Sequence, residues 1–302
     1  MVTKSVERTI RLSDGFIHIH LWQDGLPPRR VVVLIHGLMM HGKVFEMLAQ
    51  HLVLNGALVI APDLRGFGRW HFKEGERRAI DFVGSLVDIG NLLDWVRLAY
   101  PDVPVILAGE SLGAHIARSL ASTHWHLFDG LILSSPCIRP RMMTLRLIPH
   151  AVSTAMSVGF KGQKEVSLTR FANQFLVDEP ENLKDYLSDP MSRKSLDVLE
   201  LIESMLIVGR LQVPSIPSQM PILVYRGSND GVCQSASYKQ FMSSLKSDDM
   251  TVFNCGSCAH MILQSKSIDI RVLARMADWL AAHERTGPTV KRCRSDQAGV
   301  QT

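Results

Sequence analysis

Residues 105–117 restrict the fold of this chain more tightly than any other stretch. They form an apolar run that ends in Gly-x-Ser-x-Gly and continues with small residues at helical spacing. This order predicts a strand, a sharp turn and a helix, with Ser111 at the apex. Gly109 and Gly113 flank a reversal that leaves no room for side chains. The Ser111 hydroxyl would project from the end of a sheet, and the backbone N–H of Leu112 would face whatever Ser111 attacks.

Strands and helices alternate along most of the remaining sequence. The continuous apolar runs Val31–Ile35 and Ala57–Ala61 are typical of strands that are covered on both faces. The spacing predicts an α/β fold with a mostly parallel central sheet, right-handed crossovers and helices on both faces. Besides the run before Ser111, the expected strands are Val6–Leu12, Phe16–Trp22, Val31–His36, Ala57–Ala61, Gly130–Ser134, Pro221–Arg226 and Met250–Asn254. Besides the helix after Ser111, the expected helices are one that carries Phe45, Leu48 and Leu52, and those over Ile80–Tyr100, Gln234–Leu245 and Ile268–Ala282.

The spacing of apolar residues also predicts which face two of these helices bury. Ser267 is the expected N-cap of the final helix. The residues expected to face the core are Val83, Val87, Leu92 and Val96, broadened by Leu86, Leu93 and Tyr100, in the helix over 80–100, and Val272, Met276, Trp279 and Leu280 in the final helix.

The alternation stops between residues 137 and 219, a segment without a convincing strand. Amphipathic helical stretches at Met142–Val158 and Ser195–Val208 predict instead a helical insertion over the C-terminal edge of the sheet. From Arg285 onward the chain is polar, which is typical of a loose terminus. The expected organisation is an α/β core of residues 1–136 and 220–284, a helical cap (lid) of residues 137–219 and a flexible tail of residues 285–302.

The composition and the pattern of apolar residues limit the kinds of partner and the cellular location that we expect. The 302 residues contain 33 Lys and Arg against 29 Asp and Glu, without a clustered basic stripe, which argues against a nucleic-acid partner. Residues 1–8 lack the apolar core of a signal peptide. No apolar run approaches the roughly 20 residues that span a bilayer. We therefore expect a cytoplasmic protein.

The five cysteines fit reduced thiols better than a disulfide framework. Cys255 and Cys258 have redox or zinc-ligand spacing, but no second Cys or His pair lies at a suitable distance along the chain. We expect these two residues to be small side chains in a crowded loop, and we expect no metal site.

A serine hydroxyl becomes a good nucleophile only when an imidazole takes its proton and an acid orients that imidazole. In this strand–turn–helix arrangement the chain order is serine, acid, histidine. Asp230 follows one late strand and His260 follows the next, so both would lie at the sheet edge that carries Ser111. The sequence therefore predicts Ser111 as nucleophile, His260 as base and Asp230 as the acid. Asp63 also follows a strand, but it lies upstream of Ser111.

Two backbone donors are expected to stabilise the oxyanion. One is the N–H of Leu112. The other comes from the loop after the Val31–Ile35 strand, where Gly37 frees the backbone and Leu38 offers its N–H. In the same loop we expect Gly37, Met39 and Met40 to contact substrate.

Three residues near these motifs have more than one interpretation. His36 and His41 could act as bases, but hydrogen bonds that shape their loop are the favoured role. Glu110 could be a second acid near the site, or a buried carboxylate held by backbone donors, which we favour.

These motifs resemble those of the α/β-hydrolases, and specifically their monoacylglycerol lipase/lysophospholipase-like branch. Residues 36–41 followed by Phe45 resemble its His-Gly-x-x-x-His-x-x-x-Tyr pattern, residues 63–68 resemble its Asp-x-x-Gly-His-Gly, and residues 100–113 resemble its strand into the nucleophile. In that branch the insertion is a cap that forms an acyl-chain tunnel. The chain departs from the pattern at Glu110, Ala114, Trp70 and Met261, where a His, a Gly, a Ser and an acid are usual.

The resemblance and the triad imply a serine hydrolase that cleaves carboxylic esters through an acyl-enzyme, without a metal or organic cofactor. The apolar cap and the loop around Met39 and Met40 favour a small-molecule or lipid ester with an aliphatic acyl chain, such as a monoacylglycerol, a lysophospholipid or a simple ester. The cap is also a candidate for transient contact with a membrane surface. An acyl-thioesterase or acyltransferase with the same triad is the alternative, and a non-catalytic ligand receptor on this scaffold is a third.

Overall fold

The computed structural model describes residues 5–72, 79–136, 165–169, 172, 180–210, 215–233 and 235–284. Eight strands within these residues form one sheet, and their bounds are β1 (Val6–Leu12), β2 (Gly15–Trp22), β3 (Arg30–Ile35), β4 (Ala57–Pro62), β5 (Val105–Glu110), β6 (Gly130–Ser134), β9 (Ile222–Gly227) and β10 (Met250–Cys255). The order across the sheet is β1-β2-β4-β3-β5-β6-β9-β10. β2 pairs antiparallel with β1 and β4, and every pair from β4 to β10 is parallel. The expected mostly parallel sheet is confirmed.

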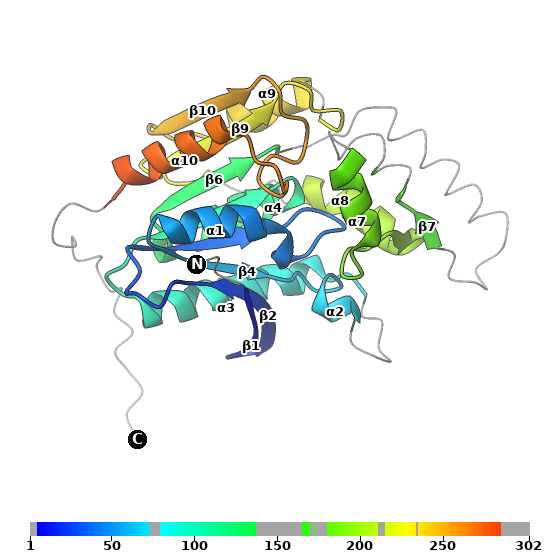
Figure 1. The fold of residues 1–302 in the computed structure, drawn as a ribbon, viewed down its shortest axis with the longest axis horizontal. Helices are drawn as coiled ribbons and strands as arrows, with labels where there is room; N and C mark the ends of the chain where they lie inside the picture. The colour runs from blue at the N-terminus through cyan, green and yellow to red at the C-terminus, as the bar shows by residue number, and fades with distance from the viewer. Residues whose placement is uncertain are drawn as a thin grey trace.

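Helices cover both faces of the sheet (Figure 1). One face packs against α1 (Glu46–Leu54) and α10 (Ile270–Ala282), and the other packs against α3 (Phe82–Ala99), α4 (Leu112–Thr123) and α9 (Ser235–Ser244). The shorter helical elements are η1 (Gly42–Phe45), α2 (Arg69–Phe72) and η2 (Trp125–Leu127). Among the described residues, no helix is long and apolar enough to cross a membrane.

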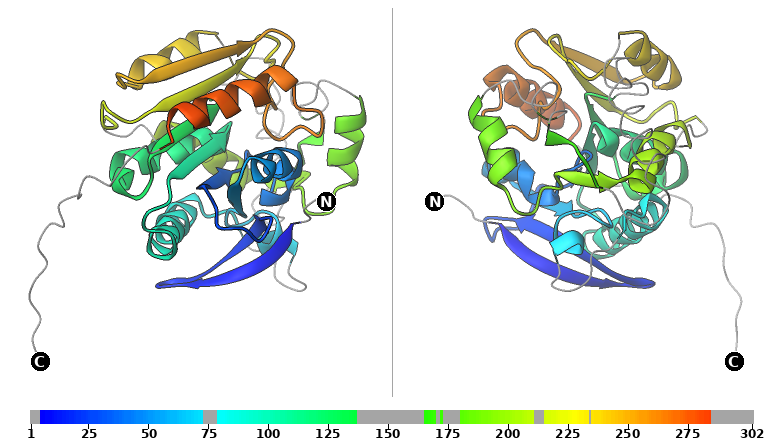
Figure 2. Two further views of the ribbon diagram at one scale, coloured as in Figure 1. Left: turned by 60° about the vertical axis from the view of Figure 1, so that its left-hand side comes forward. Right: turned by 90° about the vertical axis from the view of Figure 1, so that its right-hand side faces the viewer.

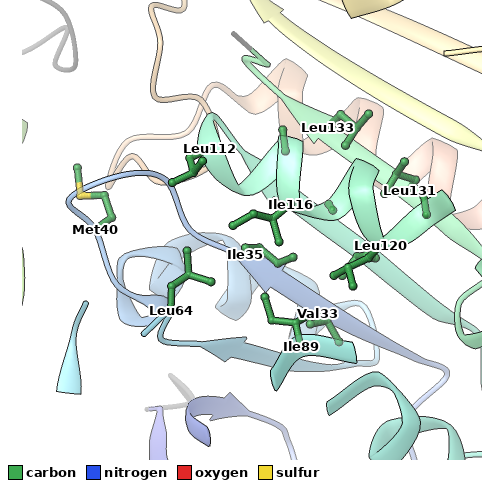
Figure 3. Packing of buried hydrophobic residues seen from close by; sticks show 14 of the residues in the cluster. Val33, Ile35, Met40, Leu64, Ile89, Leu112, Ile116, Leu120, Leu131 and Leu133 are labelled. Atoms are coloured by element: carbon green, nitrogen blue, oxygen red, sulfur yellow. The ribbon is translucent and has the colours of Figure 1, made fainter. Parts of the chain in front are cut away.

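The two cores follow from the alternation of side chains along the buried strands. Val33 and Ile35 of β3 enter the cluster that α4 covers, whereas Val32 and Leu34 enter the cluster on the opposite face. Figure 3 shows Ile35 beside Ile116 of α4 and Val33 beside Ile89 of α3. Burial on both faces explains why these strands are continuously apolar.

The predicted core face of α3 was partly wrong. Val83 and Val87 are 65% and 46% exposed, while Leu92 and Val96 are fully buried. Val83 and Leu92 are nine residues apart, so at about 100° per residue they lie on opposite sides of the helix. The apolar residues that α3 buries are Phe82, Ile89, Leu92, Leu93 and Val96.

The final helix was predicted more accurately. The four residues expected on its core side are all buried. Its N-cap, however, is Asp269, whose side chain accepts a hydrogen bond from the Arg271 N–H at 2.8 Å, and not Ser267. The helix begins at Ile270, which leaves Ser267 two residues too early to cap it.

The described residues between 165 and 210, called here the inserted segment, lie beside the carboxyl ends of the parallel strands (Figures 1 and 2). The expectation that this region has no strand was wrong, since β7 (Glu165–Ser167) and β8 (Ser195–Asp197) pair antiparallel. This pairing delays the helix expected from Ser195, so that α8 spans Val198–Arg210, and α7 spans Pro180–Ser188. The helix expected over Met142–Val158 and the tail over 285–302 lie outside the described residues.

Shortening a core side chain should destabilise the protein strongly. Leu133 of β6 is fully buried, so Leu133→Ala removes apolar contacts and leaves a cavity that costs about 2–5 kcal/mol of unfolding free energy. Urea denaturation followed by circular dichroism measures this loss. Leu98→Ala is the matched control, because Leu98 is 83% exposed on α3 and its loss should change stability by about 0.5 kcal/mol or less. Equal losses in the two variants would contradict the packing described here.

Candidate active site

Ser111 occupies a strained turn between β5 and α4. Its φ of 56° and ψ of −116° lie in a region that non-glycine residues rarely adopt. The neighbouring glycines are sterically required, because a Cβ on Gly109 would collide with the carbonyl of Gly113, and a Cβ on Gly113 would collide with the carbonyl of Ile35. The N–H of Ser111 donates to the carbonyl of Ser134 at 2.9 Å, which fixes the turn to β6.

The structure brings His260 and Asp230 to Ser111. His260 Nε2 lies 2.9 Å from Ser111 Oγ, and His260 Nδ1 lies 2.9 Å from Asp230 Oδ2. A carboxylate only accepts, so Nδ1–H donates to Asp230 and Nε2 is left to accept the serine proton. The other oxygen of Asp230 accepts the backbone N–H groups of Val232 at 2.8 Å and Cys233 at 2.9 Å. These residues thus form one continuous line of hydrogen bonds.

Asp230 and His260 each stabilise the charged form of the other, which shifts both pKa values. Burial alone would lower the pKa of His260, but the charge and hydrogen bond of Asp230 outweigh it and raise the pKa above the usual value of 6.5. Burial alone would raise the pKa of Asp230, yet His260 and two backbone N–H groups lower it below its usual range. Asp230 therefore stays ionised at neutral pH, and His260 is a stronger base than a solvent-exposed imidazole.

The loop after β3 lies against the turn at Ser111. A Cβ placed on Gly37 would lie 3.5 Å from the Cβ of Ser111, which is van der Waals contact, so the backbone at Gly37 lies directly beside the turn. His36 Nδ1 donates to the carbonyl of Gly37 at 2.8 Å, and its Nε2 accepts from the N–H of Leu64 at 3.0 Å. Burial lowers the pKa of His36 to about 4, so this imidazole is neutral at pH 7. Its contacts fit a role in shaping the loop.

The inserted segment holds the tip of this loop. The carbonyl of Met39, a residue with φ of 72°, accepts from the Arg193 N–H at 2.8 Å. The Tyr186 hydroxyl lies 3.7 Å from the Met39 sulfur, and His41 Nε2 lies 2.6 Å from Asp189 Oδ2. Met39 and its neighbour Met40 are both buried. The predicted contact of these methionines with substrate stays a prediction.

A buried ion pair joins the inserted segment to the core. The guanidinium of Arg193 donates to both carboxylate oxygens of Glu200, at 2.9 and 2.6 Å, and to the carbonyl of Gly66 at 3.2 Å. Glu200 also accepts the N–H of Ile80 at 3.3 Å. Burial alone would raise the pKa of Glu200, but Arg193 and backbone donors hold it below its usual range. Removing one partner would leave a buried charge uncompensated.

Asp63, the alternative acid, has other partners. Its Oδ1 accepts from the Gly42 N–H at 2.8 Å and lies 3.2 Å from His20 Nε2, and its Oδ2 accepts from the Arg69 N–H at 3.0 Å. Burial alone would raise its pKa, but these donors lower it to about 2. Asp63 therefore ties together the segments that carry Gly42 and Arg69.

Two groups among the described residues have ligand atoms that approach one another within 4.8 Å: His20 with His41 and Asp63, and Cys255 with Cys258 and Asp269. Tetrahedral zinc with ligands at 2.0–2.3 Å needs its donor atoms about 3.4–3.8 Å apart. The Asp63 carboxylate is already occupied by the donors described above. The two cysteine sulfurs of the second group are bonded to each other. Neither group fits a metal ion as it stands.

The expectation of reduced cysteines was wrong for one pair. Cys255, the last residue of β10, forms a disulfide with Cys258 in the loop before His260. A spacing of three residues permits free thiols, a metal site or a disulfide, and the tight turn after β10 brings the two Cα atoms to 5.3 Å, within disulfide range. Cys233 is a buried thiol whose Sγ lies 3.5 Å from the carbonyl oxygen of Pro136, and Cys137 and Cys293 lie outside the described residues.

Glu110 and Gln264 complete the site. Glu110 is fully buried and is held by donors from the loop after His260, the second of its two predicted roles. The role of Gln264 was not predicted from the sequence, because its side chain joins segments that are far apart along the chain and meet only in the fold. No spacing rule links it to Ser111.

The fold and the site together define a serine hydrolase of the α/β-hydrolase class. Residues 26–267 match the family described as serine aminopeptidase, S33, and the chain belongs to this family. It is an ester-hydrolysing serine hydrolase. Monoglyceride lipase of Mus musculus is 27% identical over 277 residues, which cover 89% of this chain and 88% of the mouse protein. Monoglyceride lipase of Rattus norvegicus is 29% identical over 247 residues, 80% of this chain and 78% of the rat protein.

Solved structures agree on the fold. A soluble variant of monoglyceride lipase from Saccharomyces cerevisiae, in complex with a substrate analog, superposes with a TM-score of 0.78 at 19% identity. The superposition covers 94% of this chain and 97% of the yeast chain. The expected α/β-hydrolase fold is thereby confirmed.

The disulfide can be tested by thiol labelling. Denaturation of the protein under non-reducing conditions with iodoacetamide should leave the peptide that contains Cys255 and Cys258 unmodified, whereas prior reduction should add two carbamidomethyl groups, as read by mass spectrometry. Cys255→Ser is the control, because it frees Cys258 for labelling without reductant. Modification of either cysteine in the unreduced wild-type protein would contradict the bond.

Proposed function

We propose that Ser111, His260 and Asp230 are the catalytic triad and that the reaction passes through an acyl-enzyme. The line of hydrogen bonds from Asp230 through His260 to Ser111 is the observation that supports this assignment. The raised pKa of His260 supports it further, because a general base works best when its pKa lies near the working pH.

In the proposed mechanism, Ser111 Oγ attacks the ester carbonyl while its proton passes to His260 Nε2. Asp230 stabilises the imidazolium and keeps the ring oriented. The N–H groups of Leu38 and Leu112 hold the oxyanion. His260 then gives the proton to the leaving alcohol. A water molecule attacks the acyl-enzyme while its proton passes to the same imidazole, which returns that proton to Ser111 Oγ as the carboxylic acid is released. All steps are proton transfers and acyl transfer.

We infer that the substrate is a lipid ester with an aliphatic acyl chain, with a monoacylglycerol as the first candidate. The relatives that support this inference are themselves named monoglyceride lipases. The buried methionines of the loop after β3 offer an apolar environment, and Gly37, Met39 and Met40 are the proposed contacts. The proposed organisation keeps residues 137–219 as a cap over this site. Its contact with a membrane surface and a cytoplasmic location stay predictions.

Replacing the proposed nucleophile should abolish turnover. Ser111→Ala should lose about 10⁴-fold or more of the esterase kcat, since no nucleophile remains for His260 to activate. A fluorophosphonate probe should label the wild-type protein at Ser111 and leave the variant unlabelled. Ser122→Ala, on the same helix, is the matched control and should behave as wild type. Full esterase activity of Ser111→Ala would exclude the mechanism, and a wild-type protein that fails to label would favour a ligand receptor.

A substrate panel separates the remaining chemistries. Monoacylglycerols and p-nitrophenyl esters should be hydrolysed, with kcat/KM rising up to about fourfold per added CH₂ group as apolar surface is buried. Acyl-thioesters, aminoacyl anilides and added alcohol acceptors form the comparison arms. Faster cleavage of thioesters, or transfer of the acyl group to alcohol in preference to water, would identify the alternative thioesterase or acyltransferase. Preferred cleavage of anilides would identify a peptidase.

A further inference from the structure

The carboxylate of Glu110, which lies outside the triad, accepts hydrogen bonds from five donors. It is fully buried at the end of β5, directly before Ser111. Oε1 accepts from the Ser134 hydroxyl and two backbone N–H groups, and Oε2 accepts from one backbone N–H and one side-chain amide. The donors and their distances are Ser134 Oγ at 2.6 Å, Ile262 N at 2.8 Å, Leu263 N at 2.9 Å, Gln264 N at 3.1 Å and Gln264 Nε2 at 2.9 Å.

The positions of these donors matter for the reaction. Ile262 to Gln264 follow His260 by two to four residues, on the loop that carries the base. Glu110, the residue directly before the nucleophile, therefore fastens this loop to the end of β5. The mutual position of Ser111 and His260 then depends on one buried anion that lies outside the triad.

Gln264 extends this link to a third segment. Its Nε2 donates to Glu110, and its Oε1 accepts from the N–H of Gly37 at 3.4 Å. The orientation of the amide is fixed by its partners, since a carboxylate can only accept and a backbone N–H can only donate. Gly37 directly precedes Leu38, the proposed oxyanion donor. Gln264 thus bridges the loop of the base and the loop of the oxyanion donor.

The same bonds exclude a role for Glu110 as a second general acid or base. Both of its oxygens are occupied by donors, and the side chain has no exposed surface. A group that exchanges protons with substrate must reach it directly or through one water. The carboxylate instead compensates N–H groups of a chain segment that would be buried without partners.

We propose that Glu110, together with Gln264, is the positioning residue that holds the nucleophile turn, the loop of His260 and the loop of Gly37 in register. This inference rests on the proposed triad. It assigns to the residue before Ser111 a mechanical role, in which its negative charge gathers the three segments, and an electrostatic role towards His260.

The electrostatic role follows from the groups that face His260. Asp230 and Cys233 approach it from the segment after β9, and Glu110 approaches it from the end of β5. Burial lowers the pKa of His260, whereas these three groups raise it, Asp230 most strongly. The base must be unprotonated to accept the proton of Ser111. Activity is therefore lost as pH falls through the raised pKa, and removal of the Glu110 charge moves that acid limb to lower pH.

The test is Glu110→Gln, which keeps the size of the side chain but removes its charge and turns one acceptor into a donor that faces Gln264. With the ester substrate, kcat should fall about 10- to 100-fold while KM stays within about twofold, because the loss concerns the geometry of the reacting groups. The acid limb of the kcat/KM profile should shift to lower pH. Fluorophosphonate labelling of Ser111 should slow in parallel.

Two further variants separate the parts of the proposal. Gln264→Met removes the bridge to Gly37 but leaves the Glu110 charge, so kcat should fall while the acid limb stays at its wild-type pH. Asp129→Asn is the matched control, because Asp129 is a partly buried carboxylate that accepts from Val105 N at 2.9 Å and Arg97 Nη2 at 2.8 Å, at the opposite end of β5. Its kcat and acid limb should equal those of wild type.

Wild-type kcat and an unmoved acid limb in Glu110→Gln would overturn the proposal. An equal loss in Asp129→Asn would reduce the effect to general destabilisation and also overturn it. If Glu110→Gln does not fold, Gln264→Met decides, and a wild-type kcat there overturns the positioning role. None of these results touches the proposed function, which fails if Ser111→Ala remains active or if the fluorophosphonate does not label the wild-type protein at Ser111.

Discussion

The reversal of the chain at Ser111 sets the geometry on which the site depends. β5 is buried between β3 and β6, and α4 must begin at once to lay its apolar face across them. Such a turn holds Ser111 at a positive φ, a strain of about 1–3 kcal/mol that persists only when its surroundings enforce it. The bond from Ser111 N to the carbonyl of Ser134 and the packing of Ile116 and Leu120 against β3 supply that enforcement (Figure 3). The turn is therefore a rigid reference point for less regular segments.

A buried anion beside this turn organises those segments. An isolated carboxylate inside a protein is costly, but five donors converge on Glu110 and compensate its charge. Any displacement of the loop after His260 would leave this buried charge without one of its donors. The same energetic cost therefore couples the position of that loop to the turn at Ser111. The stability of the protein and the relative position of Ser111 and His260 thus depend on the same hydrogen bonds.

The loop after β3 has a second support from outside the sheet. Arg193, Asp189 and Tyr186 of the inserted segment contact Met39 and His41. The ion pair of Arg193 with Glu200 fixes this contact to the backbone beside α2 and α3. A displacement of the inserted segment would therefore alter the loop of the proposed oxyanion donor.

Short-range patterns were enough for the strands of the eight-stranded sheet, the turn at Ser111 and the chain order of the proposed triad, Ser111, Asp230 and His260. Apolar runs of a few residues and the steric demand for Gly109 and Gly113 are local properties, and the parallel sheet brings all strand ends to one edge. Elements that depend on a distant partner were missed or misplaced. The strand at residues 195–197 exists because it pairs with residues 165–167, and the exposed side of α3 follows from which face meets the sheet.

The same division holds within the site. The residues of the proposed triad were predicted from their motifs, whereas the contacts of Glu110 with the loop after His260 and the bridge made by Gln264 arise only when residues more than 150 positions apart fold together. Glu110 is 152 to 154 residues from its donors on that loop, and Gly37 is 227 residues from Gln264. Hydrogen bonds of this kind form only when the segments are placed to within a few tenths of an ångström, and no spacing along the sequence encodes such a placement.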